Sequence, residues 1–197
     1  LGATTTIQYA ASTKFYLADK AAGTPWITKL PFPVHVVEQV IVEEKWRETC
    51  FASRYSYHHG YFDGFEREFR GFGRVEQVDV ETYGAFAAGN AAGPYITDDK
   101  TLYQPPVKTV TWFHTGGCLD RERILTQFQN EYFSPNLEHF REDDLPEPDL
   151  AAQGLTTEEW REALRACKGM LLRQEVYELE VDALHEQTAQ RPVKLFS

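Results

Sequence analysis

The sequence predicts a mainly β protein of antiparallel strands that carries one or two short helices. Aromatic residues make up 14% of the 197 residues, and flat rings are favoured on the pleated surface of strands. Several segments alternate apolar and polar residues, which is the pattern of a strand with one buried face. Glycine and proline clusters separate these segments as turns. A chain of this length can bury a sizeable core in one large domain or two small ones.

The first half of the chain is expected to consist of strands. Residues 4–9 and 14–17 read as two short strands, because apolar and polar residues alternate in both. Pro31 and Pro33 each bias the preceding residue toward extended geometry. The β-branched run that follows predicts a long strand over 34–44.

The segment 55–75 is dense in aromatic residues and glycines and predicts a β-hairpin. Tyr57 alternates with polar neighbours, as on a strand. Gly60 and the Asp63-Gly64 dipeptide supply turn chemistry, because glycine adopts positive φ without steric cost. A bulge or a close backbone approach is expected where two glycines flank an aromatic ring, at Gly71, Phe72 and Gly73.

The second strand of this hairpin is predicted to carry a charged face. Glu66 and Glu68 would lie about 6.6 Å apart along a strand, a spacing within the range of glycosidase carboxylate pairs. The neighbouring arginines would lower the carboxylate pKa values, whereas a general acid needs a raised pKa. Cross-strand ion pairing is therefore the preferred interpretation. The alternation places one set of side chains on each face: Glu66, Glu68 and Arg70 against Phe65, Arg67 and Phe69.

The other candidate sites are weaker. A strand over 107–114 is followed by a glycine turn that could bring the Cys118 thiol near His114 as a base, but a strand end leading into a capped helix explains the same residues. Adjacent His58 and His59 would point to opposite faces and could not easily chelate one ion. Zinc-binding and phosphate-loop spacings are absent from the sequence. We therefore expect no catalytic site, no metal and no cofactor.

Two helices are predicted from their caps. Asp120 is placed as an N-cap, with Leu119 and Ile124 spaced as a hydrophobic staple, and Pro135 should bound the helix, which is expected over 120–134. The second helix begins with a capping box from Thr156 to Glu159. Its apolar stripe follows at helical spacing: Trp160, Ala163, Leu164 and Cys167.

The remaining segments are predicted to be connections and one final strand. Residues 82–93, rich in alanine and glycine, suggest a flexible connector, with an enzyme lid as the alternative. The acidic, proline-containing run 141–149 predicts a solvated loop. Gly169 marks a helix end, and the alternation over 170–181 favours a strand. The polar tail 182–197 is expected to continue into a longer protein.

Net charge restricts the partners. The chain carries a formal charge of −10 and has a pI near 5.1, which argues against nonspecific binding of nucleic acid and against docking on anionic membranes. No apolar stretch approaches the roughly 18 residues of a membrane span, so direct membrane insertion is not expected. The few scattered cysteines predict buried free thiols: Cys50, Cys118 and Cys167.

Five segments in the same order resemble the middle region of the B component of bacterial insecticidal toxin complexes. Related virulence-plasmid B proteins and Rhs/YD-repeat shell proteins have similar segments. The resemblance covers positions 1–181, which would form one shell-building region. It is carried by Gly23–Trp26, Leu30–Val37, the hairpin run Tyr61–Val75, Thr111–Gly116 with Trp112 and His114, and Lys168–Tyr177.

The resemblance implies an architectural role. In such complexes the B component and the N-terminal part of the C component form a hollow β-shell around the toxic C-terminal part of the C component. The chain would then supply strands to a large curved β-shell of a secreted bacterial virulence factor, with the rest of the parent B component and the C component as partners. The motif residues would be structural, not catalytic: Tyr57, Gly60, Asp63, Gly64, Glu66, Glu68, Phe69, Arg70, Gly71, Phe72, Trp112 and His114.

Two alternatives remain open at this point. One is an autonomous β-rich module that binds a protein or a glycan, and the other is a hydrolase that uses the hairpin carboxylates. A monodisperse, stable monomer with a well-formed pocket would favour the autonomous module. Because the chain begins with Leu1 instead of methionine, we expect it to be part of a longer protein.

Overall fold

The computed structural model describes residues 2–44, 46, 49–81, 107–133, 154–179 and 195–196. Three of the sequence expectations concern residues outside these ranges and are not addressed by the structure. They are the connector at 82–93, the acidic loop at 141–149 and all but two residues of the tail at 182–197.

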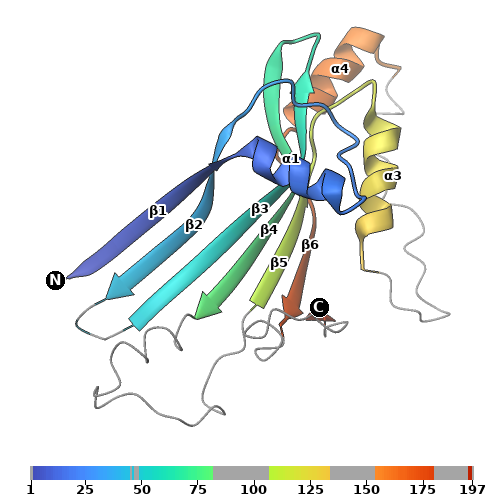
Figure 1. Ribbon diagram of the computed structural model, residues 1–197. Coiled ribbons are helices and arrows are strands. Elements are labelled where there is room, and N and C mark those ends of the chain that lie inside the picture. The colour runs from blue at the N-terminus through green and yellow to red at the C-terminus, as the bar shows by residue number, and fades with distance from the viewer. Residues whose placement is uncertain are drawn as a thin grey trace.

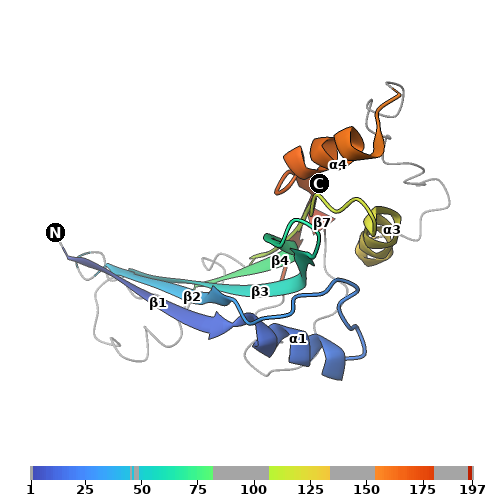
Figure 2. The same ribbon diagram turned by 90° about the horizontal axis from the view of Figure 1, so that it is seen from above.

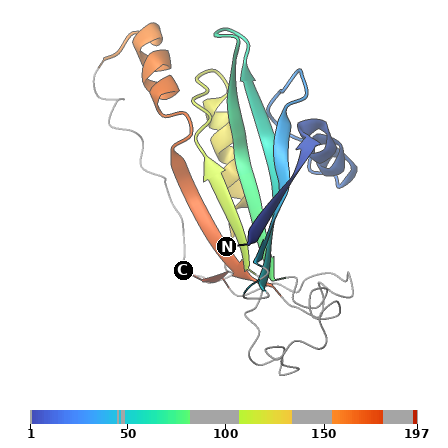
Figure 3. The same cartoon turned by 90° about the vertical axis from the view of Figure 1, so that its left-hand side faces the viewer.

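The described residues form an open antiparallel sheet, as the sequence predicts. Its seven strands follow one another in chain order from β1 to β7. The strands fan out toward the helix-free end in Figure 1 and toward the helical end in Figure 3, as in a twisted sheet. Their bounds are β1 (Ala3–Ala11), β2 (His35–Glu44), β3 (Thr49–Asp63), β4 (Glu68–Glu81), β5 (Val107–Phe113), β6 (Leu171–Glu178) and β7 (Leu195–Phe196).

Three described helices gather at one end of the sheet (Figures 1 and 2). They are α1 (Ser12–Ala21), α3 (Arg121–Glu131) and α4 (Thr157–Ala166). β2 pairs with β3 only from Gln39 to Glu44, so the strands have separated where α1 packs against β3. The other half of the sheet carries no helix among the described residues.

The strand expected at 14–17 is wrong, because these residues lie in α1. In a strand, Phe15 and Leu17 would share one face. Phe15 is instead buried while Tyr16 and Leu17 are exposed, which fits a helix that presents one ring to the sheet. The alternation is too short to separate the two structures, and the following Leu-Ala-Asp-Lys-Ala run consists mostly of good helix formers.

The two predicted helix starts have different outcomes. The Thr156 capping box is confirmed: Glu159 N donates to Thr156 Oγ1 over 3.3 Å, and Thr156 N donates to Glu159 Oε2 over 2.8 Å. Asp120 precedes α3, but its side chain makes no capping hydrogen bond. The staple from Leu119 to Ile124 is wrong, because Leu119 is 94% exposed.

Two apolar clusters hold the helices on the sheet. The larger one joins α3 to the central strands around Trp112 and Phe128, both fully buried, with Tyr61, Val110, Ile124 and Tyr132. The smaller one joins α1 and the 26–36 segment to the hairpin, and its buried members are Phe15, Trp26 and Val36.

The final strands depart from simple alternation. The register of β6 shifts because Trp112 pairs with Arg173 while Phe113 pairs with Leu171. Leu171 lies at this shift and is exposed. Within the expected polar tail, Leu195–Phe196 adds a short strand beside β6.

Close packing at Gly73 generates the first testable prediction. A Cβ at Gly73 would lie 2.5 Å from the Phe128 ring, whereas one at Gly64 would meet nothing within 4 Å. We expect Gly73→Ala to lower the free energy of unfolding by about 1–3 kcal/mol through overpacking and Gly64→Ala to leave it nearly unchanged. Urea denaturation measures both, and equal effects would contradict this packing.

Candidate functional site

The charged hairpin tip is built around Arg70, whose side chain is 0% exposed. Its guanidinium lies 2.9 Å from Asp63 and 3.4 Å from Glu68 and donates to the carbonyl of Gly116. Asp63 Oδ1 also accepts from the backbone amides of Phe65 (2.9 Å) and Glu66. Arg70 therefore fixes both the turn of the hairpin and the 114–117 loop.

The turn occupies residues 64–67, so the expected strand face with Glu66 and Glu68 on it is wrong. Arg67 takes a positive φ of 54° in this turn. Gly60 lies inside β3 instead of in a turn. A Cβ there would be 2.8 Å from Trp26 and 2.9 Å from Leu30, so close packing explains this glycine.

The two hairpin carboxylates form ion pairs, as preferred from the sequence, but their partners lie mainly on and just after α4. Glu66 lies 3.3 Å from Arg161 Nε, and Glu68 lies 3.4 Å from Arg165 Nε and 2.9 Å from Lys168 Nζ. The hydrogen bond from Lys168 lowers the pKa of Glu68. This environment favours an ionised carboxylate, the opposite of what a general acid requires.

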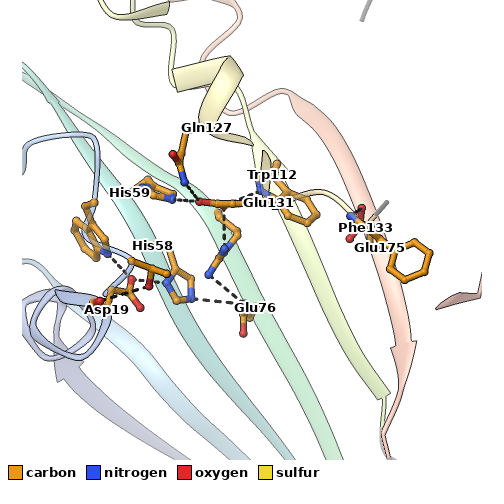
Figure 4. Close-up of polar contacts among 12 residues, drawn as sticks. Asp19, His58, His59, Glu76, Trp112, Gln127, Glu131, Phe133 and Glu175 are labelled. Carbon is orange, nitrogen blue, oxygen red and sulfur yellow. Dashed lines mark hydrogen bonds and ion pairs between the residues drawn. The ribbon is translucent and has the colours of Figure 1, made fainter. Parts of the chain in front are cut away.

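The adjacent histidines point to different helices, as the sequence suggests (Figure 4). His58 Nδ1 donates to Asp19 of α1 over 2.6 Å, and its Nε2 lies 3.8 Å from Glu76. His59, at a φ of 55°, donates from Nε2 to Glu131 of α3 over 2.8 Å. The pair therefore links two helices to β3.

Glu131 is the most heavily coordinated carboxylate among the described residues (Figure 4). Besides His59, it accepts hydrogen bonds from Arg74 of β4 (2.9 Å), Trp112 of β5 (3.3 Å) and Gln127 of α3 (2.8 Å). Burial opposes ionisation, but the hydrogen bond and charge of His59 together with Arg74 outweigh it and lower the pKa of Glu131 to about 2. The ionised carboxylate ties three strands to α3.

Glu76 extends this network along β4. Its carboxylate lies 2.7 Å from Lys108 and 3.3 Å from Arg74. Burial raises the pKa of Glu76, but Lys108 and Arg74 outweigh it, so the net pKa is lowered. Burial, and then Arg74, lower the pKa of His58, which leaves His58 neutral at pH 7.

The other motif residues have packing roles. Tyr57 donates its hydroxyl to Val37 O over 2.9 Å, and its ring contacts Phe72, which also contacts Phe69. Gly71 takes a φ of 89° where the register of the hairpin shifts. His114 Nδ1 accepts from Gly116 N over 2.9 Å. Because that nitrogen is used in a turn, the structure gives no support to a general base acting on Cys118.

Sequence reasoning missed three buried or partly buried acids: Asp19, Glu131 and Glu175. Glu175 accepts from Phe133 N (2.9 Å), Arg173 Nε (2.6 Å) and the Tyr177 hydroxyl. The only local signal was the four-residue spacing of Gln127 and Glu131 on one helix face. Within the described ranges, no group of three or more His, Cys, Asp or Glu could hold a metal ion. No described helix is long and apolar enough to span a membrane.

Residues 1–115 match the family described as the insecticide toxin TcdB middle/N-terminal region. The chain belongs to this family. The match covers more than half of the sequence and includes the whole β3–β4 hairpin. Among curated proteins, no sequence matches the chain.

Solved structures agree with the family assignment. The Photorhabdus luminescens Tc holotoxin pore matches 91% of this chain at 31% identity with a TM-score of 0.64. The TcdB2-TccC3-Cdc42 complex matches 91% at 29% identity with a TM-score of 0.67. In both cases the chain spans only 8% of the matched protein's length. The protein is therefore similar to one structural part of a toxin complex.

Replacing the buried Arg70 tests its role in holding the hairpin turn and the 114–117 loop. Arg70→Met leaves Asp63 without its ion-pair partner, and we expect a loss of about 3–5 kcal/mol in the free energy of unfolding. The matched control is Arg67→Met, because Arg67 lies exposed in the same turn and should change stability by no more than about 0.5 kcal/mol. Chemical denaturation measures both, and a mild Arg70 variant would contradict the assigned role.

Acid titration tests the Glu131 network. The pKa of Glu131 falls from 4.5 in the unfolded chain to about 2 in the folded protein. Its stabilisation is therefore complete above pH 4.5 and is lost as the pH falls toward 2. Glu131→Gln should remove about 3 kcal/mol of this pH-dependent stability.

The control for this titration is Glu122→Gln, an exposed position on the same helix. The free energy of unfolding is measured for all three proteins between neutral pH and pH 2. If the Glu131 variant keeps the full acid dependence of the parent chain, the network assignment is wrong.

Proposed function

We propose that the chain is a non-enzymatic structural segment of a toxin-complex B component. It contributes strands to a hollow β-shell, formed with the C component, that encloses and helps to deliver the toxic C-terminal part of the C component. The parent protein is a secreted bacterial virulence factor. Its partners in this role are the rest of the B component and the C component.

The observation that carries this proposal is the free edge of β1. This nine-residue strand pairs with β2 on one side and has no strand on its other side among the described residues. It contains no charged residue, and Ala3–Tyr9 are exposed. Independently folding proteins usually protect such an edge with charge or proline, which β1 lacks, or with bulges, of which its pairing with β2 has one, at Gln8/Tyr9. An uncharged edge of this length suits a strand that pairs with a neighbour in a larger sheet.

The charged residues support a structural role over catalysis. The hairpin carboxylates are paired with cations of α4, and Glu131 is committed to four donors. The pKa values of Glu68 and Glu131 are lowered, whereas a glycosidase acid requires a raised carboxyl pKa. The helices brace one end of the sheet and leave the helix-free half to continue a curved wall.

A second candidate function, an autonomous binding module, is favoured by one observation. A groove of about 450 Å³ opens between the hairpin tip and the starts of α3 and α4, a volume typical of ligand pockets. Proteins of this class fold alone and protect their sheet edges, so the state of β1 discriminates between the two functions.

Amide hydrogen exchange of β1 tests the proposal. In the isolated chain, roughly half of the β1 amides point away from β2 and should exchange quickly. In the assembled parent complex the whole strand should be protected, because the outer edge is paired. The peptide that covers α1 (Ser12–Ala21) serves as the control and should change little.

Equal exchange of β1 in the isolated chain and in the complex would refute the shell position. Encapsulation is tested separately by protease digestion of the cargo. A Thr6→Pro variant of the parent B component should interrupt edge pairing and leave the cargo open to cleavage. Continued protection in that variant would argue against a wall built through β1.

A further inference from the structure

The groove between the hairpin tip and the starts of α3 and α4 has features of a peptide-binding surface. We call it the hairpin groove. Its floor contains Tyr61, which is 8% exposed, and its rim carries Phe65 and Leu119, which are 71% and 94% exposed. Large apolar side chains that are exposed around one concave site are typical of interaction surfaces. Leu119 has no packing role, since the staple expected for it does not form.

Tyr61 provides a polar group inside this apolar site. Its hydroxyl has no hydrogen-bond partner among the described residues, although the ring is packed in the larger core cluster. The hydroxyl end lies beside Gly117, where a Cβ would be 3.0 Å from Oη, and Gly117 precedes two groove residues, Cys118 and Leu119. Unlike the Tyr132 hydroxyl, the Tyr61 hydroxyl is not a buried group without a partner, so it is open to solvent and can bind a group that enters the groove.

The rim is locally positive in a chain of net charge −10. Lys29 and Arg123 line the groove, are exposed and have no carboxylate partner within the described part of the chain. Asp120 offsets one of these charges. The other two charged groups of the rim are compensated, since Arg161 pairs with Glu66 and Asp63 with Arg70.

We propose that the hairpin groove binds an extended polypeptide segment that carries a carboxylate beside an apolar side chain. The apolar side chain packs between Phe65 and Leu119, and the carboxylate lies near Lys29 and Arg123. Aromatic residues and arginine dominate the energetic centres of protein interfaces, and both types surround this groove. This binding does not depend on the shell role, because no residue of β1 lines the groove.

The test uses the 197-residue chain and a fluorescein-labelled probe peptide, Gly-Leu-Asp-Leu-Glu-Gly with blocked ends. The labelled peptide is held at a low concentration, and the chain is added in excess, up to about 1 mM. Fluorescence anisotropy of the peptide measures its binding. We expect saturable binding that weakens as salt rises. Peptides with Asn and Gln in place of the acids, or with Ser in place of the leucines, should bind at least several-fold more weakly.

Paired variants locate the site. Leu119→Ser should weaken binding about fivefold or more, whereas Leu17→Ser, at an exposed leucine of α1, should not. Arg123→Gln should weaken binding about threefold and reduce its salt dependence, whereas Lys20→Gln should not. Tyr61→Phe keeps the ring and should weaken binding by a few-fold through loss of the hydroxyl.

Unchanged thermal midpoints confirm that these variants still fold, which is expected because Leu119, Arg123 and both control residues are exposed. The proposal is overturned if the probe does not bind. It is equally overturned if the neutral peptide binds as well as the acidic one, or if the α1 control variants weaken binding as much as the groove variants.

Discussion

The carboxylate of Glu131 is the contact on which the helical end of the structure depends. It gathers donors from β3, β4, β5 and its own helix while remaining only 14% exposed. A largely buried charge is tolerated only when its partners are held in place. The strands therefore cannot slide past one another without breaking the hydrogen bonds to Glu131. The backbone of His59, with its positive φ, holds the imidazole that donates to this carboxylate. Trp112 and Phe128 then close the apolar core around the ionic contact.

Arg70 has the same function at the hairpin tip. It contacts Asp63 beside the turn and Gly116 in the 114–117 loop, and it lies near Glu68, which pairs with α4. Glu131 and Arg70 act in the same way. Each buried charge is surrounded by groups from different elements, so the helices and strands are fixed relative to one another. This explains how a segment so rich in acids, bases and histidines can belong to a structural family. The charged groups fix the positions of the helices and strands.

The sequence predicted what local patterns encode. The β-branched run located β2 within a residue, and the Thr156 capping box located α4. The prediction from the sequence was wrong at 14–17, because four residues cannot distinguish a period of 2 from one of 3.6. It was also wrong at Gly60, which lies in a strand where close packing against Trp26 leaves no room for a side chain. The site was harder still. His59 and Glu131 are 72 residues apart, so no short motif could join them, and only the three-dimensional structure reveals why the hairpin residues occur together.

The strand order has a consequence for how such a sheet can form. From β1 to β7 every strand pairs with the strand that precedes it in the chain, so no strand waits for a partner synthesised much later. Contacts between successive strands close shorter loops than crossed topologies do, and shorter loops cost less entropy to close. A chain that emerges N-terminus first, from a ribosome or from an export channel, can therefore extend the sheet one strand at a time and leave a growing edge ready for the next segment.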